Sequence, residues 1–253
     1  NFRTKEKSKV VSNLMLIAIK KRSFASKLLI INSLILVIFY IIYSLMPDLD
    51  ISIAKLFYFE NGRFLADEYT FIKDLRSLTK NLMIALPVLS LILIIQIYID
   101  YKKKKLEKKS FRLRKRIFIY MGFLIGPLVG CGLIANLYFK DTWGRARPVH
   151  IIEFNGDKFY TPPFEKSNQC EKNCSWIGGE VSAAFSFLTG ILIIKKSSIL
   201  FRINIIFGIF VAFCRMAMGG HFFSDNLFAA VFMIYLALFY RFIFYYLTKR
   251  KLI

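Results

Sequence analysis

The sequence lacks the glycine-rich signatures that cradle nucleotide phosphates, because neither GxGxxG nor GxxxxGK followed by Ser or Thr occurs in its 253 residues. It also has no internal repeat and no low-complexity linker, which favours a single integral domain over residues 1–253. The chain has only four cysteines, and its 16 acidic residues are far fewer than its 37 Lys and Arg. With a hydrophobic content of 56%, these counts exclude a secreted disulfide mini-protein, a disordered chain and a coiled coil.

The apolar residues gather in six runs, and the net charge of the chain is +21. Long apolar runs and a high charge are hard to combine in a water-soluble protein. Mean hydropathy is +0.49, and a bilayer would solvate the runs while the charges stay outside. Six spans of about 20 residues need roughly 120 residues, about half of the chain. We therefore predict an all-α, six-span transmembrane helical bundle, with spans at residues 28–45, 82–99, 117–137, 180–194, 200–218 and 226–247.

The N-terminal region is predicted to be a basic cytoplasmic tail, residues 1–27, followed by an anchor. The first apolar run is longer than the core of a secretory signal and has no small-residue cleavage site after it, so we expect it to be retained. Residues 10–19 are apolar but too short to cross a bilayer, and they are predicted to form an interfacial helix. Pro87 and Pro127 fall inside two spans, where helical bundles tolerate proline.

Basic residues indicate which side faces the cytoplasm. Ten Lys and Arg crowd residues 102–116, between the second and third spans, against one acid, Glu107. Both termini are therefore predicted to be cytoplasmic, with residues 47–80, 138–179 and 219–225 outside. The excess positive charge then sets the orientation of the chain in the membrane and attracts anionic lipid headgroups. No nucleic-acid partner is expected.

The first external segment, residues 47–80, mixes apolar and charged residues with helical spacing. We predict that it forms an amphipathic helix or pair of helices on the outer membrane surface. The alternative is a lid or a packing element with a purely structural role.

The four cysteines divide between membrane and exterior. Cys131 and Cys214 fall within predicted spans and are expected to be small buried hydrophobic residues. Cys170 and Cys174 lie in the second external segment, where an oxidising exterior favours a disulfide. A metal site is the alternative for this pair, but no second Cys or His pair accompanies it.

A first polar cluster, residues 140–148, follows the third span. Lys140 and Arg147 are held apart by a turn that contains glycine, before Pro148. A phosphate dianion needs several cations at one small site, since guanidinium forks match its oxygens and an ammonium adds a point charge. The alternative is a row of interfacial anchors that meet lipid headgroups.

A second polar cluster surrounds a Gly-Gly turn between the last two spans. Arg215, His221 and Asp225 bracket this turn, and ionisable groups at membrane edges are costly. The carboxylate of Asp225 could hold one imidazole nitrogen of His221 and leave the other free as a nucleophile. The alternative is a histidine bonded to the backbone, with Asp225 as a helix N-cap.

The start of the fourth span carries Gly178, Gly179 and Glu180. Two glycines at a helix N-terminus free backbone N–H groups to cradle an oxyanion, and the helix dipole adds to the attraction. The alternative for Glu180 is an acid that is favoured in the first turn by the dipole alone.

Together, the spacings Lys-x6-Arg-Pro and Arg-x5-His-x3-Asp resemble the first and third signatures of the type 2 phosphatidic acid phosphatase family, and the phosphatase-like core covers residues 117–247. This resemblance implies that Lys140, Arg147 and Arg215 bind the phosphate. It also implies that His221 attacks phosphorus and that Asp225 supports the histidine.

The middle signature of that family, Pro-Ser-Gly-His, departs here to Ile177-Gly178-Gly179-Glu180. Only Gly179 is kept, and Glu180 stands where the family has the histidine that protonates the leaving oxygen. An acid at this position must be at least partly desolvated to act, because a free glutamate is mostly ionised at neutral pH. We list Glu180 with His221 and Asp225 as candidate catalytic residues.

The run Cys-x3-Cys-Ser-aromatic-x-x-Gly-Glu also resembles the bacterial lipid A phosphatase subgroup, in which Glu stands at this place. The resemblance implies a multi-pass enzyme of the bacterial inner membrane that removes the phosphate at position 1 or 4′ of lipid A, with its active site facing the periplasm. No carboxylate cluster suited to Mg²⁺ accompanies the cations, so a reaction without metal or cofactor is expected.

Several alternatives stay open at this point. Undecaprenyl diphosphate or phosphatidylglycerol phosphate would fit the same motifs as substrates, and so would a lipid phosphotransferase reaction. A non-catalytic lipid or anion transporter would bind phosphate with the same cations. An assembly scaffold would leave five charged or titratable positions at motif spacing unexplained.

Overall fold

A computed structural model of the chain describes residues 23–103, 110–194 and 198–248, and its regular structure within these ranges is helical, with no β-strand. The long helices are α2 (Phe24–Leu45), α5 (Phe71–Lys102), α6 (Phe111–Pro127) with its continuation η1 (Leu128–Lys140), α9 (Ser198–Ala217) and α10 (Phe223–Thr248). The short ones are α3 (Leu49–Lys55), α4 (Leu65–Glu68), η2 (Pro148–His150), η3 (Ile152–Phe154), α7 (Gly179–Ser186) and α8 (Leu188–Ile191). The predicted all-α class is confirmed, and the predicted helix at residues 10–19 lies outside the described residues.

Five helices within the described ranges are long and apolar enough to cross a membrane: Phe24–Leu45, Phe71–Lys102, Phe111–Lys140, Ile199–Ala217 and Phe223–Thr248. They fall where five of the six spans were predicted. The predicted span at 180–194 is instead divided into α7 and α8. Hydroxyl groups explain the break, because Ser186 donates to the carbonyl of Ala183 and Thr189 to that of Ser186, which competes with regular helical bonding.

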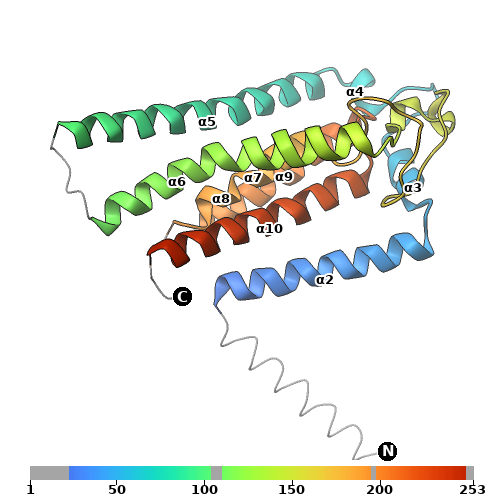
Figure 1. Ribbon diagram of the computed structural model, residues 1–253. Coiled ribbons are helices and arrows are strands. Elements are labelled where there is room, and N and C mark those ends of the chain that lie inside the picture. Colours follow the sequence, from blue (N-terminus) through green and yellow to red (C-terminus); the bar gives the residue numbers. More distant parts are fainter. Residues whose placement is uncertain (1–22, 104–109, 195–197, 249–253) are drawn as a thin grey trace, which may run out of the picture.

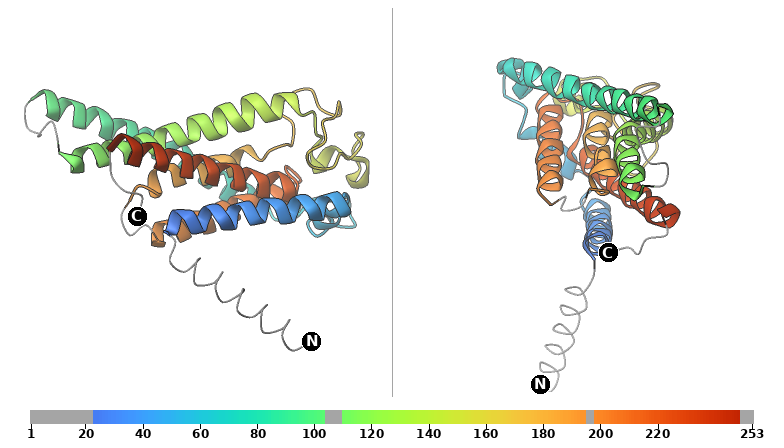
Figure 2. Two further views of the ribbon diagram at one scale, coloured as in Figure 1. Left: turned by 60° about the horizontal axis from the view of Figure 1, so that its bottom comes forward. Right: turned by 90° about the vertical axis from the view of Figure 1, so that its left-hand side faces the viewer.

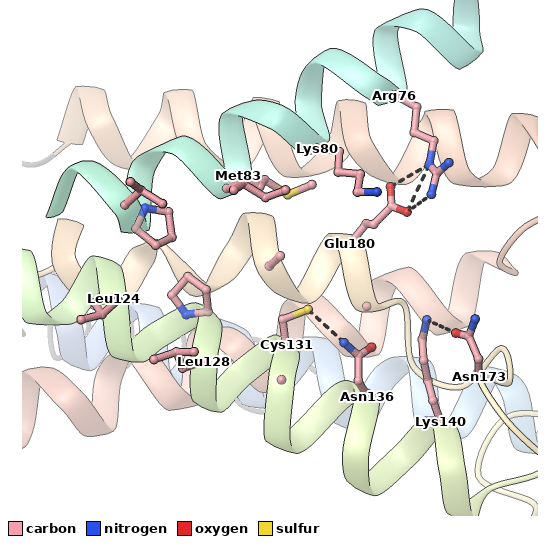
Figure 3. A pocket seen from close by; sticks show the side chains of 17 residues that line it. Arg76, Lys80, Met83, Leu124, Leu128, Cys131, Asn136, Lys140, Asn173 and Glu180 are labelled. Atoms are coloured by element: carbon pink, nitrogen blue, oxygen red, sulfur yellow. Dashed lines mark hydrogen bonds and ion pairs between the residues drawn. The ribbon is translucent and has the colours of Figure 1, made fainter. Parts of the chain in front are cut away.

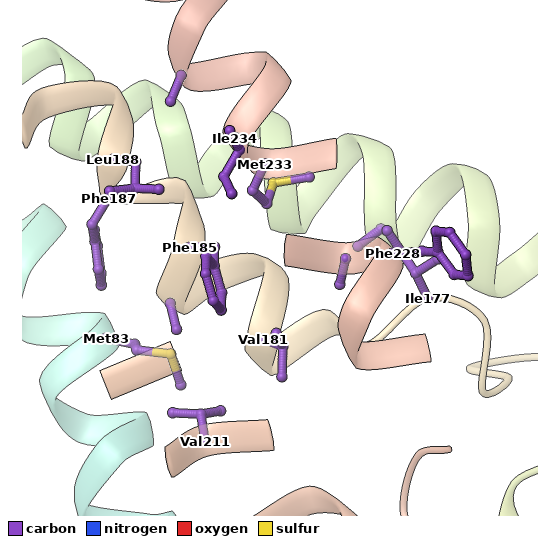
Figure 4. Close-up of a cluster of buried hydrophobic side chains, with 14 of the residues drawn as sticks. Met83, Ile177, Val181, Phe185, Phe187, Leu188, Val211, Phe228, Met233 and Ile234 are labelled. Atoms are coloured by element: carbon purple, nitrogen blue, oxygen red, sulfur yellow. The ribbon is translucent and has the colours of Figure 1, made fainter. Parts of the chain in front are cut away.

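Helices α7 and α8 lie at the centre of the bundle and pack against α6, η1, α9 and α10. Val181, Phe185 and Leu188 belong to the main cluster of buried apolar side chains, drawn in Figure 4. Helices α6 and α8 approach very closely, since a Cβ added to Gly122 would lie 2.7 Å from Cα of Gly190. Small residues permit such backbone contact between membrane helices, where apolar burial alone gives little attraction.

The outer helices enclose this centre and turn apolar side chains outwards. Helix α2 is attached to α10 by polar contacts, since Nδ2 of Asn32 donates to the carbonyl of Val231 at 3.1 Å and the hydroxyls of Ser33 and Tyr235 are 2.8 Å apart. Figure 2 shows α2 and α5 on different sides of the bundle. Their large aliphatic residues are widely exposed, which fits a surface in contact with lipid.

The segment between α2 and α5 forms the short helices α3 and α4 at one end of the bundle (Figure 1). Phe64 is buried there with Phe154 and Phe222, as expected for the packing-element alternative. Residues 71–80 were predicted as part of the external segment, but they belong to α5. No glycine or proline interrupts α5 before Pro87, so its charged first turns and its apolar part form one continuous helix.

Residues 141–178 connect η1 to α7 and lie at the same end of the bundle as α3 and α4 (Figure 1). The basic residues Arg112, Arg114 and Arg116 begin α6 at the opposite end of that long helix. The predicted site residues and this part of the basic cluster at residues 102–116 are therefore separated by the length of α6 and η1.

Candidate active site

His221 and Asp225 lie close together at the start of α10. Nδ1 of His221 is 3.7 Å from Oδ2 of Asp225, which is longer than a hydrogen bond, and both side chains are buried. The turn before them needs its glycines, because Gly219 has a φ of 58° and a Cβ on Gly220 would lie 2.5 Å from Nη2 of Arg215. The carboxylate lies beside Nδ1, so Nε2 is the nitrogen left to face a substrate.

The carboxylate of Asp225 is fixed by three donors. Its Oδ2 accepts hydrogen bonds from the hydroxyl of Ser175 at 2.5 Å and from the backbone N–H of Phe222 at 2.8 Å. Its Oδ1 accepts one from Nη1 of Arg145 at 2.6 Å. Asp225 is the third residue of α10 and accepts from the N–H of Phe222, which precedes the helix, so it is not the N-cap that the alternative interpretation expects. It stabilises the start of α10 from within the first turn and at the same time faces the imidazole of His221.

Arg145 is a residue of this site that the motif spacing did not single out. It is fully buried, and its Nη2 donates to Oδ2 of Asp50 at 2.7 Å while its Nη1 donates to Asp225. Burial opposes the charged form of Arg145, but the carboxylates of Asp225 and Asp50 outweigh it, so its pKa is raised. Asp50 also accepts hydrogen bonds from the hydroxyl of Tyr43 at 2.8 Å and from the backbone N–H of Ser224 at 3.0 Å.

The imidazole of His221 is held in its neutral form. Burial is the main cause, and it lowers the pKa of His221 to about 3; the positive charges of Lys140 and Arg215 add to the shift, whereas Asp225 opposes it. Lys140 and Arg215 come from η1 and α9, so the fold brings two of the predicted phosphate ligands within electrostatic reach of the predicted nucleophile. A neutral imidazole is the form that can attack phosphorus.

Lys140 and Arg147 meet at Asn173. Nζ of Lys140 donates to the side-chain oxygen of Asn173 at 3.4 Å, and Nη2 of Arg147 donates to its backbone carbonyl at 2.7 Å. Cys170 and Cys174, which flank Asn173, form the disulfide that the sequence favoured. Burial lowers the pKa of Arg147, although its charge is supported by Asp225 and Glu180. Neither cation contacts a carboxylate within 4.0 Å in the described part of the chain, so both remain available to an anion.

Arg215 is the third predicted cation, and its exposed fraction is only 6%. Its Nε has no hydrogen-bond partner among the described residues, and it lies 3.8 Å from Oε1 of Glu180. A buried guanidinium that is incompletely bonded is costly, so this side chain is suited to an incoming phosphate oxygen.

Glu180 lies in the first turn of α7 and pairs with Arg76 of α5, a residue that sequence reasoning missed. Nε of Arg76 is 3.2 and 3.1 Å from the two carboxylate oxygens, and Nη2 is 2.6 Å from Oε1. Such a pair favours the ionised carboxylate, which accepts protons and does not donate them. Gly179, the residue before Glu180, packs closely against two side chains of η1. A Cβ added to Gly179 would lie 3.1 Å from Nζ of Lys140 and 2.7 Å from Oδ1 of Asn136.

Fold and site together define a polytopic helical protein with a cationic pocket beside a buried, neutral imidazole. Residues 116–249, more than half of the chain, match the PAP2 superfamily, and the chain belongs to this superfamily. It is a membrane lipid phosphatase, so the family and the hydrolase class expected from the motifs are confirmed.

Three curated relatives carry the same printed name, lipid A 4′-phosphatase. The relative from Francisella tularensis subsp. novicida is 35% identical over 199 residues, which cover 77% of this chain and 85% of the relative. Those from Rhizobium etli and Rhizobium leguminosarum are 30% and 29% identical over 107 and 105 residues, which cover 40% of this chain and 39% and 43% of the relatives. No solved structure gives a significant match.

Proposed function

We propose that the protein removes the 4′-phosphate of lipid A. The observation that carries this proposal is the His221–Asp225 pair near the three cations Lys140, Arg147 and Arg215, in a chain that is similar over most of its length to a lipid A 4′-phosphatase. The names of all three relatives favour position 4′ over position 1, the two positions that the motifs leave open.

In the proposed reaction, Nε2 of His221 attacks phosphorus, the bond from phosphorus to the sugar oxygen breaks, and a phosphohistidine forms. The sugar oxygen takes up a proton as it leaves. Water then attacks the phosphohistidine, which releases inorganic phosphate and returns the imidazole to its neutral state. Asp225 faces Nδ1 and stabilises the positive charge that develops on the ring in the first step.

Lys140, Arg147 and Arg215 are the proposed ligands of the phosphoryl oxygens, with the backbone at Gly179 beside them. Their charges stabilise the oxygens that gain negative charge in the transition state. Glu180 was predicted as the acid for the leaving oxygen. Its pairing with Arg76 favours the carboxylate, so we assign that proton to water.

We further propose that the chain crosses the inner membrane six times, with both termini in the cytoplasm. In this arrangement α7 and α8 together take the place of the fourth span, inside the other helices. The site then lies at the periplasmic face, opposite the basic residues at the start of α6.

The test is mass spectrometry of lipid A from cells with and without the protein, with fragmentation to locate a missing phosphate. Loss of the 4′-phosphate is expected, and it should not occur with His221→Ala. Phosphate release from purified protein, without metal added, then tests the chemistry directly. An unchanged lipid A profile would overturn the substrate assignment, and release from undecaprenyl diphosphate or phosphatidylglycerol phosphate would identify the alternative.

The phosphate-release assay also distinguishes an enzyme from a transporter. Binding of lipid A without any release of inorganic phosphate would overturn the hydrolase reaction, whereas release that persists in His221→Ala would remove the proposed nucleophile. A phosphorylated peptide containing residue 221, stable to base and labile to acid, would identify the proposed intermediate.

A further inference from the structure

A groove of about 610 Å³ lies between α5 and the continuous helix formed by α6 and η1, with the start of α7 at one end (Figure 3). Its size falls in the range of pockets that hold small organic ligands. The end nearest the active site is polar and includes Arg76, Lys80, Lys140 and Glu180. The rest is apolar, lined by Met83, Ile84, Pro87, Val88, Leu124 and Leu128.

The polar end carries three cations against one carboxylate. Arg76 is paired with Glu180, whereas no hydrogen bond or ion pair joins Lys80 to the described part of the chain. Lys140 is bonded to a neutral side chain, that of Asn173. The uncompensated positive charge at this end matches an anionic group that enters the groove.

Glu180 lies between two guanidinium groups, because Arg76 bonds its carboxylate directly and Arg215 approaches it to 3.8 Å. The carboxylate therefore fixes Arg76 next to one of the phosphate-binding cations. Arg76 comes from α5, which lies outside the region that matches the superfamily, residues 116–249. The site thus includes a cation that lies outside the family signatures.

We propose that this groove is a lipid-binding subsite: Arg76 and Lys80 hold an anionic oxygen of the lipid headgroup, and the apolar part holds one of its hydrocarbon chains. Glu180 is a positioning residue that orients Arg76 for this contact. The proposal rests on the proposed function in that the bound lipid is the phosphatase substrate, whose phosphate reaches Lys140 at the same end of the groove.

The apolar part of the groove is suited to a hydrocarbon chain. Of the six residues named above, five are aliphatic or Met and none is charged, and all six lie on helices long enough to span the membrane. Gly132, on the η1 wall, has open space beside it, since an added Cβ would approach no atom closer than 3.9 Å. A larger residue at this position would therefore occupy the groove without a backbone clash.

The test measures equilibrium binding of two phosphomonoester lipids, dioleoyl and dibutanoyl phosphatidic acid, to the full chain carrying His221→Ala. This background removes the proposed nucleophile, so binding is observed without turnover. Gly132→Leu is expected to weaken binding of the dioleoyl lipid at least tenfold and to leave the dibutanoyl lipid unchanged. Ile84→Trp, on the opposite wall and exposed in α5, is a second variant that fills the groove.

Arg76→Gln is expected to weaken binding of both lipids at least tenfold, because both carry the anionic group. The matched control is Lys73→Gln, since Lys73 lies on the same helix, pairs with Asp67 and does not line the groove. Because Glu180 acts through Arg76, the double variant Arg76→Gln with Glu180→Gln should bind no more weakly than Arg76→Gln alone. If Glu180 had a purely structural role, the double variant would instead bind the lipids more weakly than Arg76→Gln alone.

Unchanged binding of the dioleoyl lipid by both groove-filling variants would overturn the chain-binding role of the groove. Equal binding by Arg76→Gln and Lys73→Gln would overturn the headgroup contact. These outcomes do not depend on the reaction. If the wild-type protein released no phosphate from lipid A, the proposed function would be contradicted, but the two binding comparisons would still test the groove.

Discussion

Arg145 binds Asp225 through a contact of 2.6 Å between Nη1 and Oδ1, and both side chains are fully buried. The same guanidinium binds Asp50, which lies in α3, outside the region that matches the superfamily. The carboxylate that faces His221 is thus held in place from a segment that carries none of the family motifs. A buried charge network of this kind is strongly destabilised when one partner is removed.

We expect Asp50→Asn to lower both stability and turnover. Arg145 would keep Asp225 as its only carboxylate partner and shift towards it, which alters the support of His221. Loss of one partner from a buried pair costs about 3–5 kcal/mol, so the unfolding midpoint should fall markedly. We expect kcat to fall roughly tenfold with little change in KM, as measured by phosphate release at a temperature where the variant is folded.

Asp48→Asn is the matched control for this variant. Asp48 lies two residues earlier in the same segment, is exposed, and its side chain makes no capping hydrogen bond at the start of α3. Its removal should change neither the unfolding midpoint nor kcat. If Asp50→Asn behaved like Asp48→Asn, the role of Asp50 in the site would be refuted.

The protonation of His221 gives a second prediction. Because its pKa falls from the ordinary 6.5 to about 3 on folding, the fold favours the neutral ring. The native state therefore has its full stability above pH 6.5 and loses this contribution as the pH falls towards 3. His150 is the only other histidine, so a His150→Asn variant leaves a single imidazole to observe by NMR.

The ring resonances of that variant should not shift between pH 7.5 and pH 5. The pH dependence of kcat/KM, which reports groups of the free enzyme and substrate, should show no inflection that belongs to His221 in this range. A ring titration near pH 6.5 would show that the imidazole is solvated and not buried against Lys140 and Arg215.

Motif spacing predicted Lys140, Arg147, Arg215, His221 and Asp225, because the chemistry of phosphate binding requires these residue types at fixed positions on few elements. It also predicted that they share one end of the bundle, and the burial and electrostatics of His221 agree with this for Lys140 and Arg215. A spacing rule of this kind works because each motif lies on one element or one turn.

The remaining contacts could not be predicted in this way. Arg76 and Glu180 are separated by 104 residues, and Arg145 and Asp50 by 95, so only the packing of helices brings them together. In the sequence, Arg76 belongs to a segment of mixed charge, and Arg145 stands between two cations with a motif role. The one available signal was an acid just beyond the end of a membrane helix, as at Asp50 after α2, where an unpaired buried carboxylate is costly.

Reduction of the Cys170–Cys174 disulfide should weaken substrate binding. The bridge encloses Asn173, which accepts hydrogen bonds from both Lys140 and Arg147, so its loss frees two proposed phosphate ligands to change position. We expect dithiothreitol to raise KM roughly three- to tenfold with little effect on kcat. The Cys170→Ser variant should have the higher KM from the outset and should not respond to reductant; a wild-type KM that ignores the reductant would contradict the role of the bridge.

The close contact of α6 with α8 gives a prediction about stability. An added Cβ at Gly122 would lie 2.7 Å from Cα of Gly190, and both residues belong to helices whose backbones cannot yield locally. Gly122→Ala should therefore separate the two helices and destabilise the protein by about 1–3 kcal/mol, the usual cost of overpacking. Gly132→Ala is the control on the same continuous helix, because its Cβ would enter open space. Thermal unfolding in detergent should show a lower midpoint for Gly122→Ala alone, and equal midpoints for the two variants would mean that α6 and α8 are not in backbone contact.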